Sequence, residues 1–184
     1  MSKEYPTLSE ARKKLEHYCA YQDRCHDEVI QKLRSLGMDR DQTDAIVVQL
    51  IADNFLNEER FAQSFARGKH RIKHWGKIRI VRELKFRNIS QYNINTALKE
   101  ITPEEYLNTF HTLAERIWDS LTGQASANRN KKFCDYLLRK GFESQLVYEK
   151  AKELQHSWLY LDLFVHHLRP ALSALSFMAC CAAP

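Results

Sequence analysis

The sequence predicts an all-α protein built from tandem three-helix repeats of the helix-turn-helix type. Only 5 glycines and 4 prolines occur in 184 residues, too few for the turns of a β-sandwich of this length. Apolar residues recur every three or four positions, the spacing of the buried face of an amphipathic helix. An internal repeat of about fifty residues groups the helices into units. Apolar residues make up 44% of the chain, which is enough for packed cores.

Three helices are expected in the N-terminal part of the chain. Thr7 and Glu10 have the spacing of a capping box, in which each side chain accepts from the backbone N–H of the other. A second helix is expected to open at Asp27 and to end at Gly37, because glycine tolerates the left-handed conformation that follows many helices. A third is expected to start at Asp41. The side chains expected to face the core are Leu8, Ala11, Leu15, Tyr18, Val29, Ile30, Leu33, Leu36, Ile46, Val47, Leu50 and Ile51.

The middle of the chain carries signals for three more helices. The first is expected to follow Asn57, whose side chain can accept from an early backbone N–H, and to break at Trp75 and Gly76. A second follows that break, and a third runs from about Gln91 to Ile101. The side chains expected inward are Phe61, Phe65 and Ile72 on the first helix, and Ile80, Val81 and Leu84 on the second.

The C-terminal part carries signals for a seventh, an eighth and a ninth helix. Thr102 and Glu105 form a second capping-box pattern, with a proline at the first helical position. A loop is expected at 123–130, the eighth helix is expected to end at Gly141, and the ninth to begin after Ser144. The apolar stripe of the seventh helix is Tyr106, Phe110, Leu113, Ile117 and Leu121.

One pattern recurs around the end of the second helix of each unit. Its stops, Gly37, Asn88 and Gly141, are 51 and 53 residues apart. The apolar residues around them are Val29, Leu33 and Met38, then Ile80, Leu84 and Ile89, then Phe133, Leu137 and Phe142, and twelve residues later Leu50, Ile101 and Leu154. The predicted repeats are therefore residues 1–55, 56–101 and 102–158, and such units bury their faces on one another, as in helical solenoids.

Residues 159–184 are expected to form an apolar tail. Apolar spacing lets the ninth helix extend toward Pro170, which would stop it, and the chain after Pro170 has no charged side chain. This tail is expected to be a helix extension followed by disorder. Its apolar run is too short to span a bilayer, so no membrane partner is expected.

The cysteines and histidines predict neither a disulfide framework nor a metal site. The five cysteines are odd in number, form no CxxC motif and follow no apolar signal segment, which indicates a cytoplasmic protein. His17, Cys19, Cys25 and His26 match no common zinc spacing, and we expect Cys19 in a core and Cys25 in a loop. Neither a metal nor a cofactor is therefore expected.

The sequence offers no catalytic constellation. It has no Walker loop, HExxH or GxSxG motif, so we expect no enzyme and no catalytic residue. The acidic pairs Glu58–Glu59 and Glu104–Glu105 stand at helix starts, where they favour the positive end of the helix dipole. His70 and His74 are four residues apart, as metal ligands can be, but they lie within a basic run and are expected at the surface beside a polyanion.

The basic run is the most informative functional signal. Between residues 67 and 87, one acid, Glu83, accompanies nine cations: Arg67, Lys69, Arg71, Lys73, Lys77, Arg79, Arg82, Lys85 and Arg87. A merely solvated helix face usually alternates its charges, so these nine are the candidate residues for binding a polyanion or an acidic partner. Arg79, Arg82 and Phe86 are expected on the exposed face of their helix. Trp75 is either a core residue at the break or a stacking platform.

Residues 56–89 resemble the signature of the RecX family. The matching segments are Leu56-Asn57-Glu58-Glu59-Arg60-Phe61-Ala62 and Gly76-Lys77-Ile78-Arg79-Ile80-Val81-Arg82-Glu83-Leu84, with Leu33-Arg34-x-Leu36-Gly37 upstream. The similarity covers about residues 8 to 155. It implies an elongated, curved array of three-helix repeats that binds the RecA–DNA filament. Asn88 departs from the family, in which glycine is commoner at this stop.

The resemblance implies a non-enzymatic regulator of the RecA recombinase in DNA repair, recombination and the SOS response. Such a regulator modulates, and most simply inhibits, ATPase activity, strand exchange or filament growth. We expect a monomer that binds naked DNA weakly and without sequence preference. The alternative is a helix-turn-helix transcriptional regulator with residues 79–87 as its recognition helix.

Overall fold

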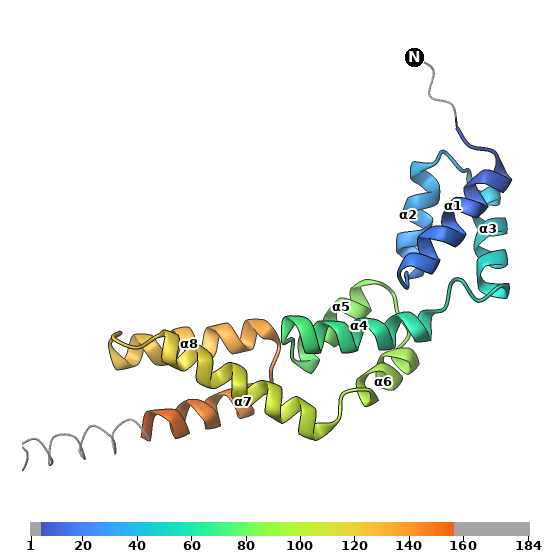
Figure 1. The fold of residues 1–184 in the computed structure, drawn as a ribbon. Helices are drawn as coiled ribbons and strands as arrows, with labels where there is room; N and C mark the ends of the chain where they lie inside the picture. The colour runs from blue at the N-terminus through green and yellow to red at the C-terminus, as the bar shows by residue number, and fades with distance from the viewer. Residues whose placement is uncertain (1–4, 157–184) are drawn as a thin grey trace, which may run out of the picture. The chain divides into compact units, whose positions relative to one another are not determined.

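The computed structural model describes residues 5–156, and within them the regular elements are all helices (Figure 1). They are α1 (Leu8–Tyr21), α2 (His26–Ser35), α3 (Arg40–Ala52), α4 (Glu58–Lys73), α5 (Lys77–Phe86), α6 (Gln91–Lys99), α7 (Pro103–Ser120) and α8 (Ser126–Lys140), with residues 144–156 also helical. The predicted all-α class is confirmed. None of the described helices is both long and apolar enough to cross a membrane. The expected tail, residues 159–184, lies outside the described residues.

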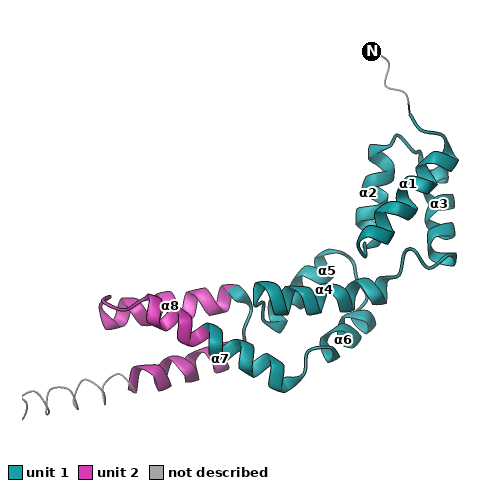
Figure 2. Ribbon diagram, in the orientation of Figure 1, with its two compact units in different colours: residues 1–113, 140–142 teal, residues 114–139, 143–184 magenta. Residues whose placement is uncertain are grey.

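The chain divides into two compact units (Figure 2). The first contains residues 1–113 and 140–142, and the second contains residues 114–139 and 143–184. Helix α7 therefore begins in the first unit and ends in the second.

The caps of the first three helices are partly those expected. Thr7 forms its capping box, with its backbone N–H 2.9 Å from Glu10 Oε2. The predicted starts of the other two helices were each one residue late. Helix α2 begins at His26 rather than Asp27, and α3 begins at Arg40 rather than Asp41. The Asp39 carboxylate accepts from the Gln42 backbone N–H at 2.8 Å, and the Gln42 side chain accepts in return at 3.1 Å. With Asp39 as the cap of this second box, α3 begins one residue before the predicted Asp41.

Helices α1, α2 and α3 enclose one core. Its buried residues are Ala11, Leu15, Cys19, Val29, Leu33, Met38, Ile46, Leu50 and Leu56. Leu8 and Ile51 were expected inward but are each 46% exposed, since they lie in the first and last turns of their helices. Cys25 lies in the loop before α2, as expected, but its side chain is wholly buried there. Burial raises the pKa of the Cys25 thiol, so it stays uncharged.

The predicted repeat is present in the described helices. Gly37, Asn88 and Gly141 all have left-handed backbones, with φ of 81°, 58° and 89°. The nine apolar residues grouped around them are all buried, none more than 8% exposed. Leu50 and Ile101 are buried as well, whereas Leu154 is half-buried.

A backbone contact joins Gly141 to the start of α5. The Gly76 N–H donates to the Lys140 carbonyl at 2.9 Å, and the Ile78 N–H donates to the Gly141 carbonyl at 3.1 Å. A Cβ on Gly76 would lie 2.1 Å from the Gly141 oxygen, and one on Gly141 would lie 2.3 Å from Arg79 Cβ. Both positions therefore need glycine. At the start of α2 the corresponding contact uses side chains, with Asn88 Nδ2 2.9 Å from Asp27 Oδ2.

The loop before α8 is shorter than predicted. Its polar residues suggested a loop through 130, but α8 already begins at Ser126. Arg129 is only 6% exposed. Its guanidinium donates to the Trp118 carbonyl at 2.8 Å and lies 4.2 Å from the Trp118 ring centre. Packing of this arginine holds a polar segment in helical form, an effect that local polarity does not reveal.

Replacing Gly141 with alanine should destabilise the protein more than the same change at Gly123. Both have positive φ, 89° and 86°, so each alanine bears a similar strain of about 1 kcal/mol. A Cβ at Gly123 meets nothing within 4 Å, whereas one at Gly141 collides with Arg79. Urea unfolding of both variants measures the difference. Equal losses of unfolding free energy would show that the contact with α5 does not constrain the fold.

Candidate polyanion-binding surface

Helices α4 and α5 carry the predicted basic residues. The Asn57 side chain caps α4 as expected, accepting from the Arg60 N–H at 3.0 Å. The helix ends at His74, which has a left-handed φ of 51°. Ile80 and Leu84 anchor α5 with no exposed surface, so the opposite face of α5 is directed to solvent.

Three of the nine cations are held by carboxylates. Arg67 pairs with Glu100 at 2.9 Å, and Arg87 pairs with Glu83 at 3.1 Å. Arg71 donates twice to Glu105, at 2.7 and 3.2 Å. Hydrogen bonds from Arg71 lower the pKa of Glu105, so this carboxylate remains ionised. Within the run the sequence shows one acid, but folding brings Glu100 and Glu105 from beyond it. One half of the capping box expected at Thr102 is present, since the Thr102 hydroxyl accepts from the Glu105 backbone N–H at 3.2 Å. The Glu105 side chain binds Arg71 instead.

A second group of cations is held against aromatic rings. Arg87 and Lys69 lie 5.0 and 5.1 Å from the centre of the Phe65 ring. Lys69 and Arg79 lie 5.2 and 4.0 Å from the centre of the Trp75 ring. We call this alternating series of Arg87, Phe65, Lys69, Trp75 and Arg79 the cation–π ladder. Trp75 is half-buried and its ring carries cations of its own chain, so it is neither a fully buried core residue nor an open platform for a base.

Three cations remain on the surface without an ion pair among residues 5–156, and they form the exposed basic face: Lys73, Arg82 and Lys85. The last cation, Lys77, lies 4.7 Å from the centre of the Tyr106 ring. The prediction that Arg79 shares this exposed face is wrong, because it is half-buried against Trp75.

Apolar side chains accompany the exposed basic face. Phe86 is 82% exposed, as its predicted position on the outer face of α5 requires. Ile72 is 73% exposed, although it was expected in the core, and Ile78 is 54% exposed. An exposed mixture of cations and apolar groups suits a partner that offers both anionic and apolar surface.

His70 replaces Ile72 in the interior. It has no exposed surface, its Nδ1 donates to the Trp75 carbonyl at 2.9 Å, and its ring stacks on Tyr106 with centres 5.5 Å apart. The predicted surface position of His70 is therefore wrong, and His74 is half-buried. The described residues include no cluster of three or more histidines, cysteines or acids that could hold a metal ion.

Comparison with known proteins matches most of the described helices to one family. The model of the second three-helix domain of RecX matches residues 57–98, and that of the third matches residues 104–150. The regulatory protein RecX of Limosilactobacillus reuteri is 26% identical over 136 residues, covering 74% of this chain and 51% of that protein. The RecX of Lactobacillus gasseri is 32% identical over 140 residues, covering 72% and 50%.

Solved structures agree with these matches. The crystal structure of RecX from Lactobacillus salivarius has a TM-score of 0.68 and 27% identity, covering 80% of this chain and 96% of that one. The chain spans about half the length of the two sequence relatives named above. The repeat of left-handed stops, the helical array and these matches agree, and the chain belongs to the RecX family of regulatory proteins.

Proposed function

We propose that this chain regulates the RecA recombinase by binding the RecA–DNA filament, and that it catalyses no reaction. Membership of the RecX family of regulatory proteins is the observation that carries the proposal. The most direct outcome of binding is inhibition of ATP hydrolysis, strand exchange or filament growth. As part of this proposal, the chain acts as a monomer in the cytoplasm.

The exposed basic face supplies a physical basis for filament binding. Lys73, Arg82 and Lys85 can contact phosphates or acidic side chains, while Ile78 and Phe86 can contact apolar protein surface. A filament of protein on DNA offers both kinds of surface together.

The backbone at the start of α5 argues against the alternative of a helix-turn-helix transcriptional regulator. Such a protein inserts the N-terminal end of its recognition helix into the major groove. Here the N–H groups of Gly76, Lys77 and Ile78 donate to the Lys140 carbonyl, the Tyr106 hydroxyl and the Gly141 carbonyl. That end of α5 is thus covered by the chain itself.

One member of each acidic pair has a structural partner, which supports a non-enzymatic role. Glu58 lies 2.8 Å from His26 Nδ1, and Glu105 is bound by Arg71. Both pairs stand in the first turns of their helices, where negative charge is favoured by the helix dipole.

The chain should bind naked duplex DNA weakly and without sequence preference. With three exposed cations, the logarithm of the affinity should fall with the logarithm of salt concentration with a slope of about −3. Fluorescence anisotropy with two unrelated duplexes across a salt series measures both properties. A tight complex with one duplex, insensitive to salt, would favour the transcriptional regulator.

Glu105→Gln should strengthen DNA binding by about two- to fivefold at low salt. The change releases Arg71 from its carboxylate, so this arginine can reach a phosphate. Glu104→Gln is the matched control, because it removes the same charge from an exposed neighbour on α7. Equal gains in the two variants would mean that only net charge matters and that the Arg71–Glu105 pair does not restrain binding.

Arg82→Glu combined with Lys85→Glu should abolish the effect of the chain on RecA ATP hydrolysis. Both side chains are exposed, so reversing them should change unfolding free energy by less than about 1 kcal/mol in total. Arg79 is left intact because it covers Trp75. Lys13→Glu with Lys14→Glu reverses two exposed charges on α1 as the control. The measurement is ATPase rate on single-stranded DNA, and a folded but fully active Arg82/Lys85 variant would exclude this face.

A further inference from the structure

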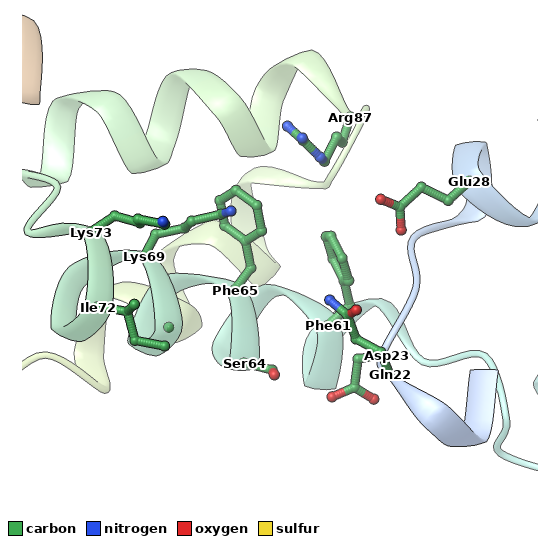
Figure 3. A pocket seen from close by; sticks show the side chains of 11 residues that line it. Gln22, Asp23, Glu28, Phe61, Ser64, Phe65, Lys69, Ile72, Lys73 and Arg87 are labelled. Atoms are coloured by element: carbon green, nitrogen blue, oxygen red, sulfur yellow. The ribbon is translucent and has the colours of Figure 1, made fainter. Parts of the chain in front are cut away.

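A cavity of about 300 Å³ opens where the loop between α1 and α2 meets α4 and the end of α5 (Figure 3). Its lining residues are Gln22, Asp23, Glu28, Phe61, Ser64, Phe65, Gly68, Lys69, Ile72, Lys73 and Arg87. Its volume is at the lower end of the range for small-ligand sites. The cavity shares Lys73 with the exposed basic face but not Arg82 or Lys85, and regulation through that face leaves the rest of the cavity unexplained.

The charges of the cavity are separated toward two ends. Lys69 and Lys73 extend from α4 toward Phe65, and Arg87 lies over that ring (Figure 3). Glu28 lies beyond Phe61, away from the lysines. The two phenyl rings between the charged ends are 5.7 Å apart and tilted by 35°. The cavity therefore offers a cationic end, an apolar middle and an acidic end.

The acidic end retains hydrogen-bond acceptors. Glu28 uses Oε2 to accept from the Cys25 N–H at 3.2 Å, and Asp23 uses Oδ1 to accept from Arg60 Nε at 2.7 Å. The second oxygen of each carboxylate has no hydrogen bond to the described residues. A ligand that fits must thus present an anion at one end and hydrogen-bond donors at the other.

We propose that this cavity binds one unpaired nucleotide, and that it prefers a base with an exocyclic amino group. The phosphate meets Lys69, Lys73 and Arg87, the base lies against Phe61 and Phe65, and the amino group donates to Glu28 or Asp23. Cytosine satisfies this pattern. Thymine has no amino group, and its single ring N–H stands between two carbonyl oxygens that a carboxylate repels.

An acidic peptide with an aromatic side chain fits less well. It would meet the cations and the rings, but its own carboxylates would be repelled by Glu28 and Asp23. Duplex DNA is excluded for another reason, since its paired bases are stacked on one another and cannot lie against Phe61 and Phe65. The preference is therefore confined to unpaired strands, and it adds to the proposed regulation of RecA–DNA filaments without requiring RecA for its measurement.

The test compares labelled oligo-dC and oligo-dT of about ten nucleotides by fluorescence anisotropy with the full chain. Oligo-dC should bind roughly five- to tenfold more tightly. Gly68→Leu should remove this advantage by filling the cavity, since a Cβ at Gly68 meets nothing within 4 Å and no charge changes. Gln31→Leu adds the same side chain to an exposed position of α2 outside the cavity lining, and it should preserve the advantage.

Glu28→Gln tests the acidic end separately. The amide oxygen can still accept from the Cys25 N–H, so the start of α2 is kept, while the preference for oligo-dC should shrink toward unity. Equal binding of the two oligomers by the unmodified chain, or an unchanged preference in the folded Gly68→Leu variant, would overturn the assignment. Tighter binding of an acidic, phenylalanine-containing peptide than of oligo-dC would overturn it as well.

Two further arms separate related outcomes. Titration with dCMP identifies the source of the nucleotide: weaker binding than oligo-dC assigns the cavity to a strand, and equal or tighter binding assigns it to the free nucleotide. Either result supports a nucleoside phosphate as the ligand. The RecA ATPase assay is independent, because loss of the oligo-dC preference in Gly68→Leu with unchanged ATPase modulation would separate this cavity from the proposed filament-binding face.

Discussion

The backbone contact between Gly141 and Gly76 fixes where α5 begins and which of its faces is buried. The first N–H groups of a helix have no partner within it, and here carbonyls of residues 140 and 141 supply two of the missing acceptors. The approach is so close that a Cβ on either glycine would collide with the opposite backbone or Arg79 Cβ. Since α5 carries Arg82 and Lys85, the position of these two residues of the exposed basic face follows from this contact.

The equivalent contact at α2 shows how the repeat tolerates variation. Asn88 stands at the stop where the other two repeats have Gly37 and Gly141, and its left-handed φ of 58° is one that asparagine accepts. Its side chain reaches Asp27 at the start of α2, so the junction is bridged by two side chains. Cys25, with its own Cβ, can occupy the position that Gly76 holds in the next repeat. The presence of Asn88 instead of glycine at the stop therefore goes together with the presence of Cys25 instead of glycine at the start of α2.

Local spacing was sufficient to predict the helices but not the surface chemistry. The helix ends at Gly37 and Gly141 were predictable because the residue that follows a helix often has a positive φ, which favours glycine. Apolar spacing alone predicted that Ile72 is buried, but Ile72 is exposed. His70 is buried instead, with its ring hydrogen-bonded to the Trp75 carbonyl. The carboxylate that binds Arg71 lies 34 residues away in the sequence, beyond any local count of charge. Nine candidate cations consequently reduce to three that are both exposed and without an ion pair among residues 5–156.

The cation–π ladder links that surface to the cavity. Lys69 and Arg87 lie over Phe65 and also line the cavity, so a phosphate bound there competes with the ring for both cations. Interactions of this kind contribute about 0.5–1 kcal/mol each at exposed sites, which a charge-assisted hydrogen bond to phosphate can exceed. Lys69 also contacts Trp75, which supports Arg79 on α5. Occupation of the cavity would therefore loosen the support of α5, and by thermodynamic reciprocity a partner that draws on α5 would change nucleotide affinity by the same factor.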